Sequence, residues 1–139
     1  MTFRVVAGVV VGIVAWWLLF LGVGIAFGLL WGDYRLAARA FFSDQDGGHF
    51  TTAMLLLNWL VFIIAGAADG WLVSLISRKR IAGLVVAALY LLYTLFDHYY
   101  LLWHNLPTWY NLIVPWVIAG SILIGSRLVR PPHPRRPEP

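Results

Sequence analysis

The chain has 139 residues, of which 61% are hydrophobic and only 12% are charged. A soluble domain is nearer half apolar and a quarter charged, so a water-excluding core is not the expected organisation. The chain contains no cysteine, which excludes disulfides, cysteine-ligated zinc, iron–sulfur clusters and thiol redox chemistry. The net charge of +4 does not indicate a nucleic-acid partner, because the cations gather beside apolar runs, as in membrane proteins.

Four apolar runs divide the sequence, and they cover about residues 5–31, 52–76, 81–104 and 109–128. Each is long enough for a helix that crosses a bilayer, which takes about 20 residues. We therefore predict an all-α integral membrane four-helix bundle over residues 1–129. Residues 130–139 are rich in proline and arginine and predict a disordered cytoplasmic tail. The first run is too long for the apolar part of a signal peptide, so we expect it to be retained.

The segment after the first run predicts a short helix at the membrane interface, Tyr34 to Phe42, with Asp33 as its N-cap. A loop over 43–48 follows, as its turn-forming residues indicate. The first run also carries glycines spaced by four, which allow two helix backbones to approach closely. These glycines predict packing within the bundle or against a second copy of the chain. They are Gly8, Gly12, Gly24, Gly28 and Gly32.

Orientation follows from lysine and arginine, which favour the cytoplasmic side of a membrane. If the four runs alternate in direction, eight of these residues fall on one side and two on the other. The eight are Arg4, Arg78, Lys79, Arg80, Arg127, Arg130, Arg135 and Arg136, and the two are Arg35 and Arg39. This asymmetry predicts a bacterial inner-membrane protein with both termini in the cytoplasm. Trp103, Trp109 and Tyr110 would then form an aromatic belt at the outer face.

Most polar side chains within the runs lie on the second and third, which the turn over 77–80 joins. Polar groups that face lipid are costly. On a regular helix six polar residues of the third run share an arc of about 120°, namely Tyr90, Tyr93, Thr94, Asp97, Tyr100 and His104. We therefore predict a buried polar network that joins the two runs. Its members are Asn58, Asp69, Tyr90, Tyr93, Asp97, Tyr100 and His104. Antiparallel pairing predicts that Tyr90 donates to Asp69 and that Asn58 meets Tyr100.

Three classes of function are compatible with this pattern. The expected one is a non-enzymatic accessory or scaffolding subunit, embedded in the lipid bilayer as a homo-oligomer or in a larger membrane complex. The alternative is a small proton-coupled transporter that uses Asp69 and Asp97, because intramembrane acids often act in transport. The third is an enzyme acting on a lipid or quinone through Asp97, His98 and His104. No pair of histidines is placed to hold haem between runs, so we expect no cofactor and no metal.

The C-terminal third resembles a known group of proteins. The stretch Leu102 to Leu112 reads LWHNLPTWYNL, and Gly125 to Leu128 reads GSRL. These residues are similar to the LWxxxPxWYxL turn and GxRL end of small bacterial four-span inner-membrane proteins of unknown function. The resemblance implies a bacterial inner-membrane location and assigns no activity to any residue.

Overall fold

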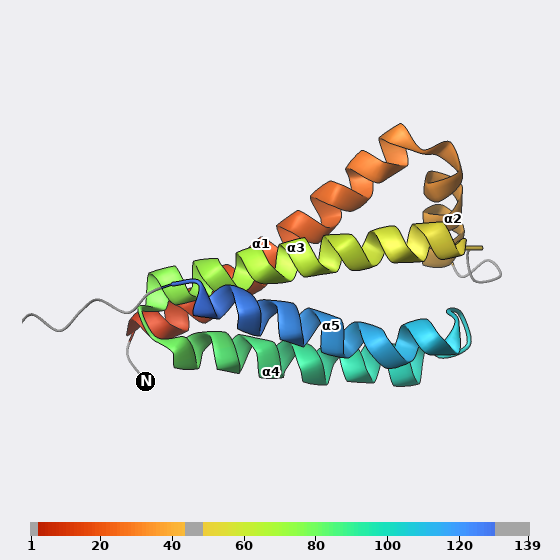
Figure 1. Ribbon diagram of the computed structural model, residues 1–139. Coiled ribbons are helices and arrows are strands. Elements are labelled where there is room, and N and C mark those ends of the chain that lie inside the picture. The colour runs from red at the N-terminus through yellow and green to blue at the C-terminus, as the bar shows by residue number, and fades with distance from the viewer. Residues whose placement is uncertain (1–2, 44–48, 130–139) are drawn as a thin grey trace, which may run out of the picture.

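The computed structural model describes residues 3–43 and 49–129, and this part of the chain is entirely helical outside its turns. The elements are α1 (Phe3–Leu30), α2 (Gly32–Phe42), α3 (Thr52–Ser77), α4 (Arg80–Phe96), the π-helical turn η1 (Asp97–Leu101) and α5 (Thr108–Arg127), and Figure 1 shows their arrangement. Four helices are long and apolar enough to cross a membrane, the third being α4 continued through η1. The prediction of an all-α chain with four such helices is confirmed. The predicted tail at 130–139 and most of the predicted loop lie outside the described residues.

Helix ends agree with the predicted runs to within a few residues, with two exceptions. The third run is predicted to continue to residue 104, but its helix ends with η1. The short helix α2 begins at Gly32, and its N-cap is Trp31. The prediction of Asp33 as N-cap is therefore wrong. Asp33 lies in the first turn instead, where an acidic side chain still interacts favourably with the helix dipole.

The tightest helix contact joins α3 to α5 through residues that lack a side chain. A Cβ atom built on Gly70 would overlap the carbonyl oxygen of Ile122, and one built on Gly125 would overlap that of Ala67. Backbone therefore meets backbone, as small residues permit between membrane helices. Around this contact, Val73 and Ile122 are completely buried and belong to the main apolar core.

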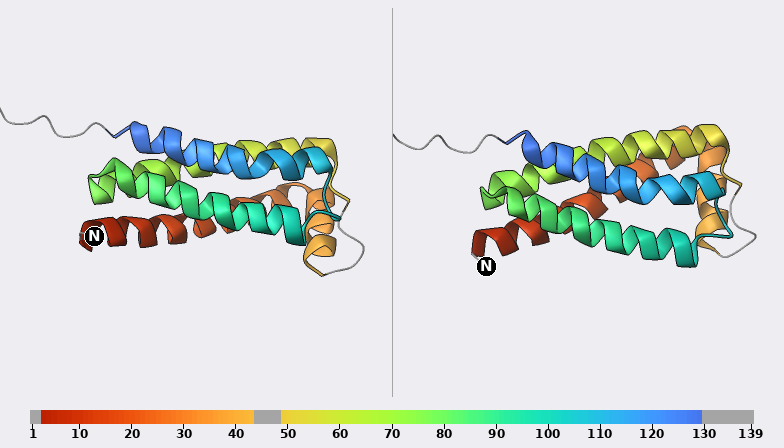
Figure 2. Two further views of the ribbon diagram at one scale, coloured as in Figure 1. Left: turned by 90° about the horizontal axis from the view of Figure 1, so that it is seen from below. Right: turned by 60° about the horizontal axis from the view of Figure 1, so that its bottom comes forward.

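The first half of α1 packs closely on the bundle, and the second half does not. Gly8 and Gly12 lie directly against Val73 and Ser77 of α3, so the prediction that they pack within the bundle is confirmed. In its second half α1 leans away from α3, and α2 turns back towards the bundle at the far end (Figures 1 and 2). Gly24 lies in this leaning half, and a Cβ atom built on it would meet no other atom within 4 Å.

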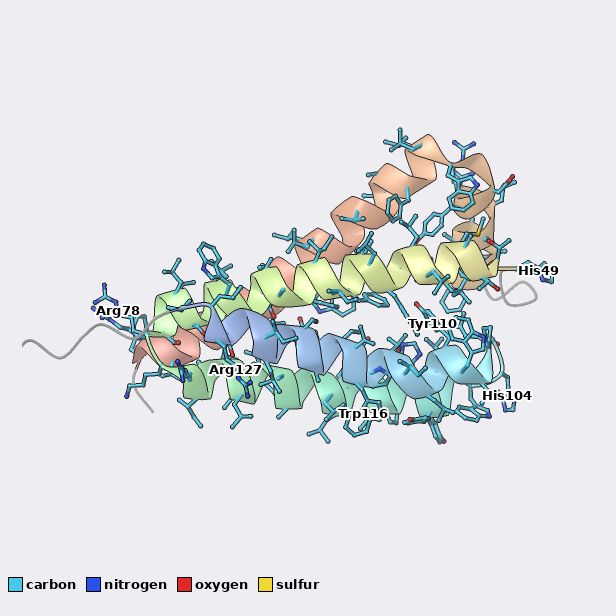
Figure 3. All side chains as sticks on the ribbon, viewed as in Figure 1. His49, Arg78, His104, Tyr110, Trp116 and Arg127 are labelled. Carbon is cyan, nitrogen blue, oxygen red and sulfur yellow. The ribbon has the colours of Figure 1, made fainter. Side chains whose placement is uncertain are left out.

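The two ends of the bundle differ in charge. Arg78 and Arg127 lie at one end, with His49 and His104 at the other (Figure 3). Arg78 ends α3 in the left-handed conformation with φ of 54°, and Ser77 bonds to both backbone groups of Lys79, which closes the turn to α4. The predicted aromatic belt at the opposite end is wrong for Tyr110, which is 3% exposed and packs inside the bundle.

Candidate functional site

The predicted polar network is divided between two places in the fold. Asp69 lies in the contact between α1 and α3, while Asn58, Tyr93 and Asp97 line a pocket nearer the other end. Tyr100 and His104 belong to neither place and are exposed. The prediction of one continuous network is therefore wrong. Each group of residues departs from the predicted position for a different physical reason.

Asp69 is sealed from solvent. Its side chain is 0% exposed, and neither carboxyl oxygen has a hydrogen-bond partner within the described residues. The predicted bond from Tyr90 is absent, because the Tyr90 hydroxyl donates to the backbone carbonyl of Ile13, with 3.3 Å between the oxygens. Pairing α3 with α4 by depth did not take account of α1, which packs against both and places Trp16 on the Tyr90 ring. An ionised carboxylate at this position would carry a large uncompensated desolvation cost.

Asn58 pairs with α2 rather than with Tyr100. The Tyr34 hydroxyl donates to Asn58 Oδ1 over 3.0 Å, whereas Tyr100 is 75% exposed. The bond attaches α2 to α3 across 24 residues of sequence. Burial raises the pKa of Tyr34 above its usual value of 10.0, while the bond to Asn58 acts in the opposite direction. Tyr34 therefore stays a neutral donor at physiological pH.

The turn η1 explains why Tyr100 and His104 leave the expected face. Up to Thr94 the polar face is that of a regular helix, and the Thr94 hydroxyl donates to the Tyr90 carbonyl over 2.6 Å. A π-helical turn contains more residues than an α-helical turn and changes the direction of the side chains that follow. His98 consequently points inward and is 6% exposed. His104 falls in the turn that leads to α5.

His98 is held by Asn111, a residue that the sequence analysis did not select. The Asn111 Nδ2 atom lies within hydrogen-bond distance of the backbone carbonyls of Leu102, Trp103 and Leu106, at 3.3, 3.4 and 3.2 Å, and its two hydrogens are shared among them. Its Oδ1 atom therefore faces His98 Nδ1, 2.9 Å away, as an acceptor. His98 Nδ1 must carry a proton to make this bond, so in the neutral ring Nε2 is an acceptor. The available signal was a lone amide side chain, between Tyr110 and Leu112, within an apolar run.

The pocket has a volume of about 380 Å³ and lies between the leaning half of α1, α2 and the rest of the bundle. Its apolar wall is aromatic, with Trp16, Trp17, Phe20 and Phe62 among its members. Its polar lining comes from several elements and comprises Tyr34, Asn58, Tyr93, Thr94, Asp97, His98 and Tyr110. Of the three residues considered for an enzyme, Asp97 and His98 line this pocket and His104 does not.

The lining of the pocket offers few metal ligands and a largely apolar surface. Asp97 and His98 are its only described lining residues of types that commonly ligate metals. No group of three or more such residues occurs in the described part of the chain. The pocket volume falls within the range of small-molecule sites, about 300–1,000 Å³. An aromatic wall with a few polar groups is also typical of such sites.

Comparison with known proteins adds no relative. No protein-family model, no curated protein and no solved structure matches the chain.

Proposed function

We propose that the chain is a multi-pass protein of the bacterial inner membrane that acts as a non-enzymatic accessory or scaffolding subunit. Four helices of membrane-spanning length support the location. The orientation, with both termini in the cytoplasm, is supported by the cations at the end of the bundle that holds Arg78 and Arg127. The likeness of the turn over 102–112 to small bacterial membrane proteins agrees with this location.

One observation supports the accessory role above the others: the outer side of a membrane-length helix is left uncovered by its own bundle. In the leaning part of α1, Leu18 and Ile25 are 66% and 65% exposed. Gly22 lies on the same side of the helix, is exposed and has open space around it. An apolar helix with an uncovered glycine can take a second helix at short distance. A partner helix, from another protein or from a second copy, would complete the packing that α1 lacks.

Affinity purification from native membranes in mild detergent, followed by mass spectrometry, tests this role. The wild-type chain should bring down a stoichiometric partner or a defined oligomer of itself. Gly22→Leu adds a side chain into exposed space that is empty within the described chain, so the fold should persist. Recovery of the partner should fall about tenfold, because the helices can no longer approach.

Gly120→Leu is the matched control, since Gly120 in α5 also has open space within 4 Å. This variant should retain the partner at the wild-type level. Recovery of a bare monomer from wild-type membranes would contradict the proposal, as would a partner that both variants retain equally.

The alternative is a proton-coupled transporter, and the unpaired carboxyl oxygens of Asp69 favour it. Against it, Asp69 is 0% exposed, and it does not line the pocket that Asp97 faces. Proton flux into liposomes containing the purified chain separates the two. A transporter would conduct protons and lose that flux in Asp69→Asn. A scaffold would give the flux of protein-free liposomes in both the wild type and the variant.

A further inference from the structure

We propose that the pocket between α1, α2 and the bundle binds a single-chain amphiphile whose head group donates hydrogen bonds and carries no negative charge, such as a long-chain alcohol or amine. The inference stands on the composition of the pocket and is independent of the accessory role proposed above.

The wall of the pocket is suited to an apolar chain. Trp16 and Phe20 of α1 stack with Phe62 of α3, with ring centroids 6.0 and 5.8 Å apart. All three side chains line the pocket. Aromatic surface of this kind favours hydrocarbon through the area it removes from water or from disordered lipid chains.

Polar lining atoms at the η1 end present acceptors. His98 Nε2 makes no hydrogen bond within the described residues, and the Asn111 bond leaves it as an acceptor in the neutral ring. The Asp97 carboxyl group also lines the pocket, and none of its side-chain oxygens is bonded within the described part of the chain. Two neighbouring acceptors that lack donors are complementary to a hydroxyl or ammonium head.

The charge of the lining selects against anions. Asp97 is the one acidic residue among the described lining residues, and these include no lysine or arginine. A carboxylate or phosphate head would lie beside the Asp97 carboxyl group, where His98 is the one described lining residue able to become cationic, and like charges in such a site repel. The aromatic rings around the site add a modest preference for cations over anions.

Exposed residues mark the mouth of the pocket. Trp17 and Tyr93 are 40% and 46% exposed, and their rings meet edge to face across α1 and α4 at 6.2 Å. Phe42 of α2 is 78% exposed and also lines the pocket. A chain can therefore enter from the bilayer, and the volume of about 380 Å³ suits one chain with a small head rather than a whole phospholipid.

The test is photo-crosslinking of the full chain in nanodiscs with three diazirine probes of equal chain length: an alcohol, an amine and a carboxylic acid. Crosslinked peptides are identified by mass spectrometry. The alcohol, the amine or both should label the pocket segments 16–20, 58–62 and 93–98 about tenfold more than the acid does. The ratio of labelling by the alcohol to labelling by the amine then shows which head group the pocket prefers.

Two pairs of variants connect the labelling to the pocket. Asp97→Asn should reduce the disadvantage of the acid to about twofold, because it removes the repelling group. Asp33→Asn makes the same change at an exposed position outside the pocket and should leave the selectivity unchanged. Ala38→Trp fills the pocket from α2 and should lower labelling by the alcohol about tenfold. Ala40→Trp, on the same helix but not in the lining, should not.

Two results would overturn the inference. One is equal labelling of the pocket segments by the acid, alcohol and amine in the wild-type chain. The other is labelling spread evenly over the exposed side of α1 that Ala38→Trp does not reduce. Thermal unfolding in a fixed detergent shows whether Ala38→Trp and Ala40→Trp still fold. If Ala38→Trp does not fold, the Asp97→Asn comparison decides instead.

Discussion

Asn111 holds together the end of the bundle at which η1 leads into α5. Its side chain is 0% exposed, shares its two amide hydrogens among three backbone carbonyls of the turn between η1 and α5, and accepts from one nitrogen of His98. No other single residue in the described chain makes as many side-chain hydrogen bonds. Removing it would leave buried acceptors unpaired, which costs about 1–3 kcal/mol for each group that water cannot reach.

We predict that Asn111→Ala lowers the free energy of unfolding by at least ~2 kcal/mol, because several of these groups lose their partner together. Thermal unfolding in a fixed detergent measures the change. The matched control is Asn105→Ala, since Asn105 is exposed in the same turn. Equal midpoints for the two variants would show that the Asn111 bonds do not hold the turn.

A second prediction concerns the bond that attaches α2. Tyr34→Phe removes the donor to Asn58 and keeps the ring in its aromatic surroundings, so the loss should be about 0.5–1.5 kcal/mol, the usual net value of one hydrogen bond. Urea or thermal unfolding of the wild type and Tyr34→Phe gives the difference. A larger loss would indicate that the ring itself had moved.

The same bond has a defined pH dependence. Because the pKa of Tyr34 is raised in the folded state, the unfolded chain loses its proton first as pH increases. The contribution of Tyr34 is therefore fully present below pH 10, and it declines as pH rises above that value. The difference between wild type and Tyr34→Phe should be constant from neutral to mildly alkaline pH and should shrink in strong base. A difference that disappears near neutral pH would contradict the assignment.

At the scale of the elements, the contact between α3 and α5 and the turn η1 account for most of the arrangement. The backbone contact at Gly70 and Gly125 fixes how closely the two helices lie. The turn η1 then decides which side chains of the third span enter the pocket. Small residues specify the contact between α3 and α5, and a local change of helical period defines η1.

We predict that Gly70→Ala destabilises the bundle by about 1–3 kcal/mol, the usual range for overpacking, since the new methyl group would overlap the Ile122 carbonyl. Gly120→Ala is the control, because Gly120 has open space around it. Replacing an uncrowded helical glycine by alanine should leave stability unchanged or raise it slightly. Thermal unfolding of both variants distinguishes a packing effect from helix propensity, and a destabilised Gly120→Ala would contradict the packing explanation.

These elements also show where sequence reasoning succeeds. Long apolar runs locate the four helices of membrane-spanning length, because helix length and hydropathy are local properties. The spacing of Gly8 and Gly12 correctly indicates packing inside the bundle. The turn η1 could not be predicted, since an extra residue in one turn leaves no mark on hydrophobic periodicity. Tyr100 and His104, which follow Asp97, were therefore assigned to the wrong face.

The pairing errors at Asp69 and Asn58 have a different origin. Both assumed that a polar residue on α3 finds its partner on the neighbouring antiparallel helix. In the structure α1 supplies the surroundings of Asp69, and α2 supplies the partner of Asn58. The helix that packs beside each polar residue of α3 depends on the packing of the whole bundle, and this cannot be read from a single sequence.

At the scale of the whole molecule, the bundle has one firmly packed end and one open end. At the end that holds Arg78, α1 packs on α3 through Gly8 and Gly12. At the other end, α1 leans away and a pocket forms beneath it. Our account places the packed end in the cytoplasm and the pocket in the outer half of the bilayer. Both proposals, the partner on α1 and the amphiphile in the pocket, require a chain that is embedded in the bilayer.

The absence of cysteine from the chain makes this topology directly measurable with single-cysteine variants. Lys79→Cys and Asn105→Cys introduce one exposed thiol at either end of the bundle. The measurement is labelling of intact spheroplasts with a membrane-impermeant maleimide, before and after permeabilisation. The account predicts that Asn105→Cys is labelled at once and that Lys79→Cys is labelled only after permeabilisation. Immediate labelling of Lys79→Cys would contradict it, as would labelling of both thiols from the same side.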